Sequence, residues 1–460
     1  MSAAALAAAV REGRLSPLEI LDAHLERIVA HNPALNAIIA VDAERARAVA
    51  RTHNRQGTLA GVPLTIKSSL DVTGLPAECG SRLRAGNIAA TDATLVARLR
   101  AAGALILGVT NVPEFLMAWE TDNALYGRTN SPWDLSRTPG GSSGGESAAI
   151  AAGLSAGGIG SDGGGSIRVP AHFTGICGLK PTPGRIPCTG HFPGSVGPFV
   201  QLGVVGPMAR SVADVRLIFE ACAGLDWGDV RAVDLPIRKP DTAGVRVAWF
   251  DDNGIAPVTP EIRAAVRAAA GALSAAGIEV EQHYPSGLDG FFDLFILFFV
   301  QCGIVFLQPL VDELGDRISP TLQRYWTKAL QRQRPDFPGL VLGWAQRDQM
   351  RLTLLEQMRR FPILLSPVCS TPAFRHGERE WNVDGRRVEY LESFSYCELC
   401  NVLGLPAAVV PAGVSPEGLP IGVQVIGRPF EEELVLAVAE IIESAHWTPK
   451  RTLADATTLG

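Results

Sequence analysis

The chain has 460 residues, of which 47% are hydrophobic and 19% are charged. With a mean hydropathy of +0.16, this composition favours a large buried core, although length alone does not separate one large unit from several smaller domains. The net charge is −6 and no basic run is interleaved with aromatic residues, so we expect no nucleic-acid partner. The eight cysteines are too sparse for a disulfide framework.

The N-terminal region predicts two helices and a strand. In "MSAAALAAAVREGRLSP" the first cation follows the apolar stretch, which is the reverse of a secretory signal, so we expect the first amphipathic helix of a cytoplasmic protein. "SPLEILDAHLERI" then places Ser16 as a cap, Pro17 at the first helical position and Glu19 three residues after the cap, which predicts a second helix. "LNAIIAV" reads as a strand.

Helices and short apolar strands alternate from there to Gly224. "GVPLTIK" predicts a buried strand that ends near Lys67, and a helix from residue 92 leads through Gly103 into a strand over Leu105 to Val109. This alternation is typical of an α/β fold with a largely parallel sheet. The charged, Pro-containing stretch 225–244 predicts a linker or surface crossover.

We divide the chain into an N-terminal helical segment that packs on the core (1–55), a core that carries the glycine loops (56–225) and the remainder of the same domain (226–460). Residues of about 288–387 are rich in Phe and Trp and predict an insertion that forms a substrate pocket, with aromatic side chains that only fill a core as the alternative. Within it, Leu294 to Leu310 carries no charge over 17 residues, just short of the ~18–20 that span a bilayer. We favour a buried helix over contact with a membrane, with an apolar wall for a lipid-like substrate as the alternative.

Two serine-bearing glycine loops, "TPGGSSGGESAAIAAG" at 138–153 and "GSDGGGSIRVPA" at 160–171, are the strongest motifs. Neither contains the lysine of a phosphate-binding P-loop or fits the dinucleotide fingerprint, which argues against a nucleotide-binding module. Cys397 and Cys400 have no second cysteine pair or nearby histidine pair, so one helical turn is a better interpretation than a metal site.

Acyl transfer fits the second loop. A serine nucleophile needs a base and backbone N–H groups directed at the developing oxyanion. Ser166 follows Gly163, Gly164 and Gly165, and these three amides with that of Ser166 are the candidate oxyanion donors. His172 and His191 lack an acid at a recognisable triad spacing. Lys67 is the remaining candidate base, provided that burial disfavours its charged form.

The two loops, together with "GVPLTIKSSLDVTG", "IRVPA" and "GLKPT", resemble the amidase signature family of serine hydrolases, and "GPMARSVADV" and "PIGVQVIGRP" extend the likeness over nearly the whole chain. The resemblance implies a large, twisted, mixed central sheet with helices on both faces. It implies a triad of Ser166 as nucleophile, Ser142 as bridging serine after a cis peptide bond, and Lys67 as base. Ser143 and Arg168 match as supports of the site. No metal or organic cofactor is expected, and a homodimer is implied because many members of the family are dimers.

Two positions depart from the family. Ser68 stands where Asp often follows the lysine, which predicts a change in how Lys67 is held. Gly163 stands where a larger residue is common, which would loosen the oxyanion loop or widen the pocket.

The segment "NVPEFLMAWETDNALYGRTN" is most similar to the fatty-acid-amide-hydrolase-like branch, which implies that Leu116, Met117 and Trp119 line the acyl pocket. We therefore expect hydrolysis of apolar or aryl amides, with esters and carbamates as further substrates. A glutamine-amidotransferase A-type subunit, which shares the triad and needs partner subunits, is the alternative.

Overall fold

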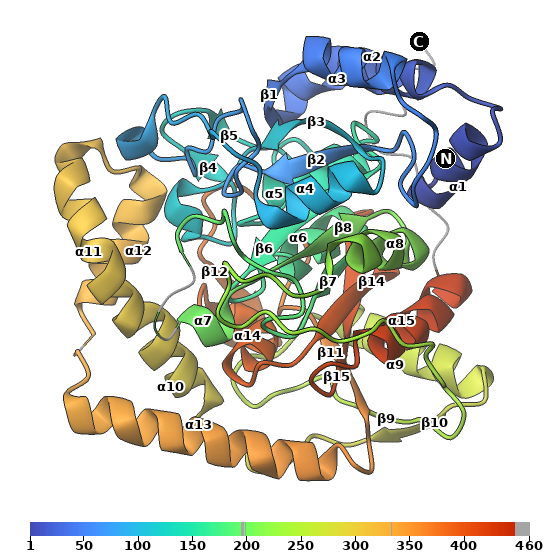
Figure 1. The fold of residues 1–460 in the computed structure, drawn as a ribbon. Coiled ribbons are helices and arrows are strands. Elements are labelled where there is room, and N and C mark those ends of the chain that lie inside the picture. The colour runs from blue at the N-terminus through green and yellow to red at the C-terminus, as the bar shows by residue number, and fades with distance from the viewer. Residues whose placement is uncertain (195–196, 198, 333, 447–460) are drawn as a thin grey trace.

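Within the residues that the structure describes, eleven strands form one mixed sheet through the middle of the molecule (Figure 1). The structure is a computed structural model that describes residues 1–194, 197, 199–332 and 334–446. The strand order is β1-β3-β2-β6-β8-β7-β14-β15-β11-β9-β10. In chain order the strands are β1 (Ile38–Val41), β2 (Pro63–Lys67), β3 (Leu105–Thr110), β6 (Gly157–Asp162), β7 (Cys177–Lys180), β8 (Val204–Ala209), β9 (Arg246–Trp249), β10 (Glu279–Gln282), β11 (Ile363–Pro367), β14 (Ala407–Val414) and β15 (Pro420–Gly427).

The mixed α/β sheet that the sequence predicts is confirmed, and its parallel pairs fall into two blocks. β3, β2 and β6 pair in parallel, as do β11, β9 and β10. The pairs between these blocks, from β6 through β8, β7, β14 and β15 to β11, are antiparallel, and so is β1 with β3. Parallel pairing therefore has a smaller share than the helix–strand alternation predicts, because hairpin-like neighbours such as β14 and β15 fill the centre.

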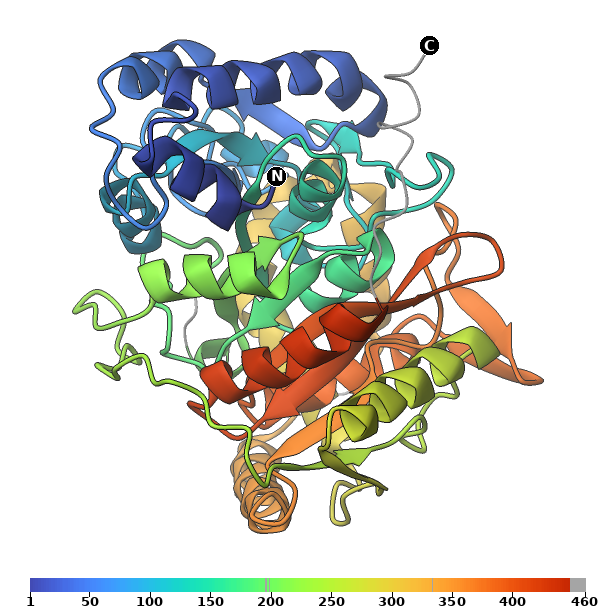
Figure 2. The ribbon, with the colours of Figure 1, turned by 90° about the vertical axis from the view of Figure 1, so that its right-hand side faces the viewer.

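Helices cover both faces of this sheet, as expected. A Cβ built on Gly157 would approach Ile218 of α8, whereas one on the next residue, Gly158, would meet Glu146 of α5. Successive strand residues point to opposite faces, so α5 and α8 lie on opposite sides of β6. Figure 2 shows α15 and α9 side by side in front of the sheet. The helices outside the insertion are α1 (Ala3–Arg11), α2 (Pro17–Leu35), α3 (Ala43–Arg51), α4 (Thr94–Ala101), α5 (Gly144–Ala151), α6 (Arg168–Thr174), α7 (Phe199–Leu202), α8 (Val212–Cys222), α9 (Pro260–Ala275), α14 (Ser395–Val402) and α15 (Glu432–His446).

The N-terminal segment forms as its caps predict. Ser16 Oγ accepts the N–H of Glu19, and the Glu19 carboxylate accepts the N–H of Ser16, so both ends of the capping box are closed. The apolar face of α2 is buried through Ile20, Leu21, Leu25 and Ile28. This segment also supplies the edge strand β1, which pairs with β3, so residues 1–55 extend the central sheet as well as packing on it.

The aromatic-rich insertion is helical and lies at one side of the sheet, in gold and orange in Figure 1. It comprises α10 (Phe291–Phe295), a π-helical turn (Ile296–Gln301), α11 (Cys302–Leu314), α12 (Pro320–Leu330) and α13 (Phe337–Gln357). The helical part of the expected 288–387 segment ends there, because β11 returns to the central sheet. The rest of that segment contains the hairpin β12 (Glu380–Val383) and β13 (Arg386–Glu389); a second small hairpin joins β4 (Asp122–Asn123) and β5 (Gly127–Arg128).

The stretch Phe291–Arg317 is long and apolar enough to cross a membrane by length and composition, and half of its most apolar window is buried inside the protein. Phe291, Leu294, Phe295 and Phe298 are buried in the core, while Val305 is 60% exposed. The buried-helix interpretation therefore holds for the first part of the segment.

Candidate active site

Lys67 is the last residue of β2, where it is completely buried. Strand β2 lies between β3 and β6 in the sheet, so the lysine is surrounded by protein at the ends of three parallel strands. Its Nζ lies 2.7 Å from Ser142 Oγ and 2.9 Å from Ser143 Oγ, and 3.3 Å from the carbonyl oxygen of Ser161. Burial lowers the pKa of Lys67 to about 7, against the opposing influence of Cys79, Asp162 and Glu146.

Ser142 and Ser143 lie in the loop that leads into α5. The Gly141–Ser142 peptide bond is cis, as the resemblance implies. The Ser143 N–H donates to the carbonyl oxygen of Ser166 at 3.2 Å, and Ser143 Oγ lies 3.3 Å from both the N–H and the carbonyl oxygen of Ser161. The two glycine loops, which are distinct in sequence, are therefore joined through Ser143.

The second loop follows β6 and is organised by a buried ion pair. Asp162 and Arg168 face each other through two hydrogen bonds of 3.0 and 2.9 Å, and both side chains are fully buried. Burial alone would raise the pKa of Asp162, but the Arg168 guanidinium holds it well below its usual range. Arg168 also donates to the carbonyl oxygen of Cys397 and to Asn401 Oδ1, which ties the loop to α14.

This arrangement corrects one expected oxyanion donor. The N–H of Gly165 donates to Asp162 Oδ1 at 2.7 Å, and the N–H of Ile167 donates to Oδ2 at 3.1 Å. Because its N–H is already committed to a carboxylate, Gly165 is removed from the set. The amides of Gly163, Gly164 and Ser166 stay as candidates. Gly165 has a turn role, with φ of +110°, a conformation that glycine adopts without steric cost.

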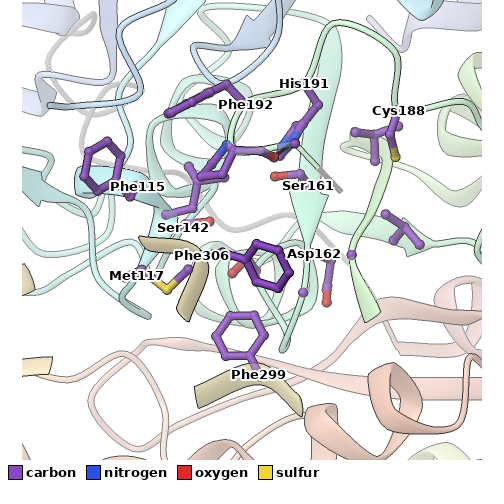
Figure 3. Close-up of a pocket in the computed structure, with 18 of the residues that line it drawn as sticks. Phe115, Met117, Ser142, Ser161, Asp162, Cys188, His191, Phe192, Phe299 and Phe306 are labelled. Atoms are coloured by element: carbon purple, nitrogen blue, oxygen red, sulfur yellow. Dashed lines mark hydrogen bonds between the residues drawn. The ribbon is translucent and has the colours of Figure 1, made fainter. Parts of the chain in front are cut away.

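A cavity of about 250 Å³ opens beside Ser142 and Ser166 (Figure 3). Phe115, Leu116, Met117, Phe192, Phe299 and Phe306 supply most of its large apolar lining, with Leu307 and Leu310 further along α11. Ser161, Asp162, Gly163, Cys188 and His191 also line it. Among the described lining residues, Asp162 is the one acidic group and no arginine or lysine is present, so the walls offer little recognition of charge.

Of the three residues expected in the acyl pocket, Leu116 and Met117 line this cavity, and Trp119 is not among its lining residues. The Trp119 ring stacks on Phe394 with a centroid separation of 4.5 Å, and its indole N–H donates to the carbonyl oxygen of Gly164 at 2.8 Å. Trp119 therefore lies behind the second glycine loop and supports it. Phe299 and Phe306 are lining residues that the sequence marked only as part of an aromatic-rich region.

The two departures from the family pattern have local explanations. Ser68 is buried, and its Oγ has no hydrogen-bond partner within the described residues; Lys67 is held by the two serines of the first loop instead. A Cβ built on Gly163 would lie 2.9 Å from Cε2 of Phe299. The space that a larger residue would take is thus already filled by this ring, and the expected widening of the pocket is wrong.

The structure also places the two histidines and the two cysteines that the sequence raised as candidates. His172 is buried, with its ring nitrogens 3.2 Å from the carbonyl oxygens of Thr371 and Gly422, so it is a packed residue as expected. His191 lines the cavity, and burial lowers its pKa to about 4, which keeps its ring neutral. Cys397 and Cys400 lie one turn apart on α14, and no group of three His, Cys, Asp or Glu side chains in the described chain is placed to hold a metal ion.

The family model described as Amidase matches residues 19–436. The chain belongs to the amidase family. It is 35% identical to an acylamidase of Rhodococcus erythropolis, over 98% of this chain and 97% of that protein. It is 36% identical to the A-type subunit of the glutamyl-tRNA(Gln) amidotransferase of Roseiflexus castenholzii, over 93% of this chain and 92% of that protein. As an amidase signature enzyme it hydrolyses carbon–nitrogen bonds other than peptide bonds.

Solved structures show the same fold. A bacterial aryl acylamidase of the amidase signature family superposes with a TM-score of 0.87 at 26% identity, covering 97% of this chain and 96% of that one. Fatty acid amide hydrolase superposes with a TM-score of 0.86 at 25% identity, covering 97% of this chain and 85% of that one. The expected family and its mixed sheet are confirmed.

Proposed function

We propose that this amidase hydrolyses apolar or aryl amides through an acyl-enzyme on Ser166, with Ser142 and Lys67 as the proton relay. The observation that carries the proposal is the 2.7 Å separation of Lys67 Nζ and Ser142 Oγ in a site where burial lowers the lysine pKa to about 7. A lysine with this pKa is partly present as the free amine at neutral pH, and a free amine can accept a proton.

In the acylation step, neutral Lys67 takes the hydroxyl proton of Ser142, and Ser142 takes that of Ser166. The Ser166 oxygen then forms a bond to the substrate carbonyl carbon, and the carbonyl π electrons move onto its oxygen. The amides of Gly163, Gly164 and Ser166 would donate to that oxyanion, which is the largest single contribution in acyl transfer.

The tetrahedral intermediate collapses when the carbon–nitrogen bond breaks. An amide nitrogen leaves poorly unless it is protonated, so the proton passes from Lys67 through Ser142 to the departing amine. Water then donates a proton into the same relay as its oxygen attacks the acyl-enzyme, and Ser166 leaves with a proton returned by Ser142. The acid product and the free enzyme result.

The cavity supports apolar or aryl substrates because its large side chains are aromatic or aliphatic. The names of the acylamidase and the aryl acylamidase among its relatives support the same class. Esters and carbamates have carbonyl groups of similar shape, and we include them as further substrates of the same nucleophile.

A glutamine-dependent amidotransferase component is the second candidate, because the A-type subunit of such an enzyme is 36% identical over nearly the whole chain. Such a component must bind the α-carboxylate and α-ammonium groups of glutamine, and buried charges need paired partners. Asp162, the one charged group among the described lining residues, is already paired with Arg168. Glutamine hydrolysis with no turnover of hydrophobic anilides would favour this candidate.

The first test is the intact mass of the protein after exposure to an alkyl fluorophosphonate. We expect a single adduct in the wild type and none in Ser166→Ala. Ser147→Ala is a matched control, since Ser147 is buried in α5 and bonds to the carbonyl oxygens of Pro139 and Gly144; it should be labelled like the wild type. An unlabelled wild type, or an adduct that persists in Ser166→Ala, would contradict the proposed nucleophile.

A further inference from the structure

Two stacked rings of the insertion abut two consecutive glycines of the oxyanion loop. Phe295 and Phe299 are nearly parallel, with ring centroids 5.0 Å apart and an interplanar angle of 11°. A Cβ built on Gly163 would lie 2.9 Å from Cε2 of Phe299, and one on Gly164 would lie 2.9 Å from Cζ of Phe295. Each glycine therefore makes room for one ring of the stack.

The two rings differ in what else they touch. Phe295 is fully buried, whereas Phe299 is half-buried and lines the cavity. Phe299 lies on the π-helical turn Ile296–Gln301, and such turns are frequent at functional sites. The ring of Phe299 has little freedom to retreat, because Phe295 lies against one of its faces and is itself held against Gly164.

We propose that Phe299 is the residue that sets the acyl preference of this enzyme, by occupying the space that a side chain at position 163 would fill, so that flat apolar acyl groups are preferred over long flexible ones. The inference rests on the proposed function, of which it specifies the substrate class. Phe295 is a positioning residue: it holds Phe299 and the glycine loop but does not touch the substrate.

The direction of proton transfer indicates where the acyl group of the substrate lies in the cavity. The leaving nitrogen must face Ser142 to receive a proton, so the acyl group points away from Ser142. In Figure 3 Phe299 lies at the end of the pocket opposite Phe192 and His191, with Phe306 beside it. A planar acyl group stacks or packs edge-to-face on such rings, whereas a flexible chain loses rotamer freedom there.

The test compares kcat/KM for p-nitroanilides of benzoic and octanoic acids. Phe299→Leu should shift the octanoyl-to-benzoyl ratio upward by about tenfold or more, since single-methylene differences in a pocket change rates by about 10–200-fold. Phe295→Leu is the comparison: because it gives the ring of Phe299 room to retreat, it should lower both rates and shift the ratio upward by less than Phe299→Leu does. A ratio that is unchanged in Phe299→Leu, or shifted as much or more by Phe295→Leu than by Phe299→Leu, would overturn the inference.

A double-mutant experiment tests the pairing itself. Gly163→Ala should reduce kcat/KM for both anilides by about 100-fold. In a Phe299→Leu background the same substitution should reduce kcat/KM by less than about fivefold, because the effects of substitutions at two contacting residues are not additive. Gly164→Ala in the Phe299→Leu background should show no such recovery. Equal recovery of both alanine variants, or recovery of neither, would contradict the pairing.

The outcomes also separate this inference from the proposed function. Rates of Ser166 labelling by short- and long-chain alkyl fluorophosphonates give the same comparison without any amide turnover. A wild type that is neither labelled nor active on anilides would refute the proposed function. If the wild type is labelled and active but Phe299→Leu does not alter its acyl preference, the role of Phe299 is refuted and the proposed function stands.

Discussion

Lys67 Nζ and Ser142 Oγ are 2.7 Å apart, although 75 residues separate them in the chain. The lysine comes from the end of β2 and the serine from the loop before α5, and both are almost fully excluded from solvent. Because water cannot stabilise an ammonium ion there, burial lowers the pKa of Lys67 to about 7. The contact depends on the position of β2 between β3 and β6 in the sheet, which buries Lys67 beside the first glycine loop.

The first prediction is the pH dependence of turnover. Protonated Lys67 cannot accept a proton, so log kcat/KM should rise with pH below about 7 and level off above the pKa of Lys67. Lys67→Met should remove detectable turnover. Lys239→Met is the control at an exposed lysine, and it should leave the midpoint of the pH profile of kcat/KM unchanged. A profile that is flat between about pH 5 and 9, measured with an uncharged anilide, would contradict a lysine base.

The second prediction is the pH dependence of stability. Lys67 has a folded-state pKa of about 7 against 10.5 for an ordinary lysine, so between these values the unfolded chain binds more protons and stability rises with pH. Below about pH 7 both states are protonated and the contribution is constant. Relative to Lys67→Met, the wild type should therefore gain up to ~1.4 kcal/mol in free energy of unfolding per pH unit between about pH 7 and 10.

Urea denaturation of both proteins at about pH 7, 8 and 9 measures this difference. All other titrating groups are shared by the two proteins, so they cancel in the comparison. A difference between wild type and Lys67→Met that does not change with pH would mean that Lys67 is charged in the folded enzyme.

The third prediction ranks the serines of the two loops. Ser166→Ala should lower kcat by about 10⁶-fold, the scale found when a nucleophile is removed from a hydrolase. Ser142→Ala should leave at most a trace of activity, because it interrupts the path between Lys67 and Ser166. Ser143→Ala should retain more, since Ser143 joins the loops and positions Lys67. Near-wild-type rates in Ser142→Ala, measured with a chromogenic anilide, would contradict the proposed proton relay.

The sequence predicted the local elements well, and it singled out the catalytic candidates, because both kinds of signal are local. The capping box at Ser16 and the apolar run that ends at Lys67 each lie within a few residues, and the serine loops have a fixed spacing. Gly165 and Trp119 were assigned wrongly for a different reason. Which acceptor the Gly165 N–H meets, and what lies behind the Trp119 ring, depend on Asp162, Gly164 and Phe394 in three dimensions.

The rest of the pocket also depends on contacts that are not local. An aromatic-rich insertion is visible in composition, but the sequence does not say which rings enter a cavity and which fill a core. Phe298 is buried and Phe299 lines the pocket, although the two are adjacent. The π-helical turn that holds them has no local sequence signal, and the match of Phe299 to Gly163 joins distant parts of the chain.

The last prediction concerns the buried pair of Asp162 and Arg168. Arg168→Met leaves a charged Asp162 without its partner in a site with no solvent exposure, and breaking such a pair typically costs about 3–5 kcal/mol. Arg359→Met is the matched control, because Arg359 and Glu356 form an ion pair whose side chains are 76% and 72% exposed; exposed pairs contribute about 0–1 kcal/mol. Guanidinium denaturation of both variants measures the contrast.

Activity gives a second readout of the same pair, in case Arg168→Met folds poorly. Asp162 holds the N–H groups of Gly165 and Ile167 on either side of Ser166, so a displaced carboxylate should disturb the oxyanion loop. Arg168→Lys keeps the charge but loses the two-point contact, and we expect it to lower kcat by about tenfold or more with a smaller change in KM, since the oxyanion contact strengthens in the transition state. Equal kcat in Arg168→Lys and wild type would show that the loop keeps its shape without the guanidinium, and would leave the ion pair with a purely structural role.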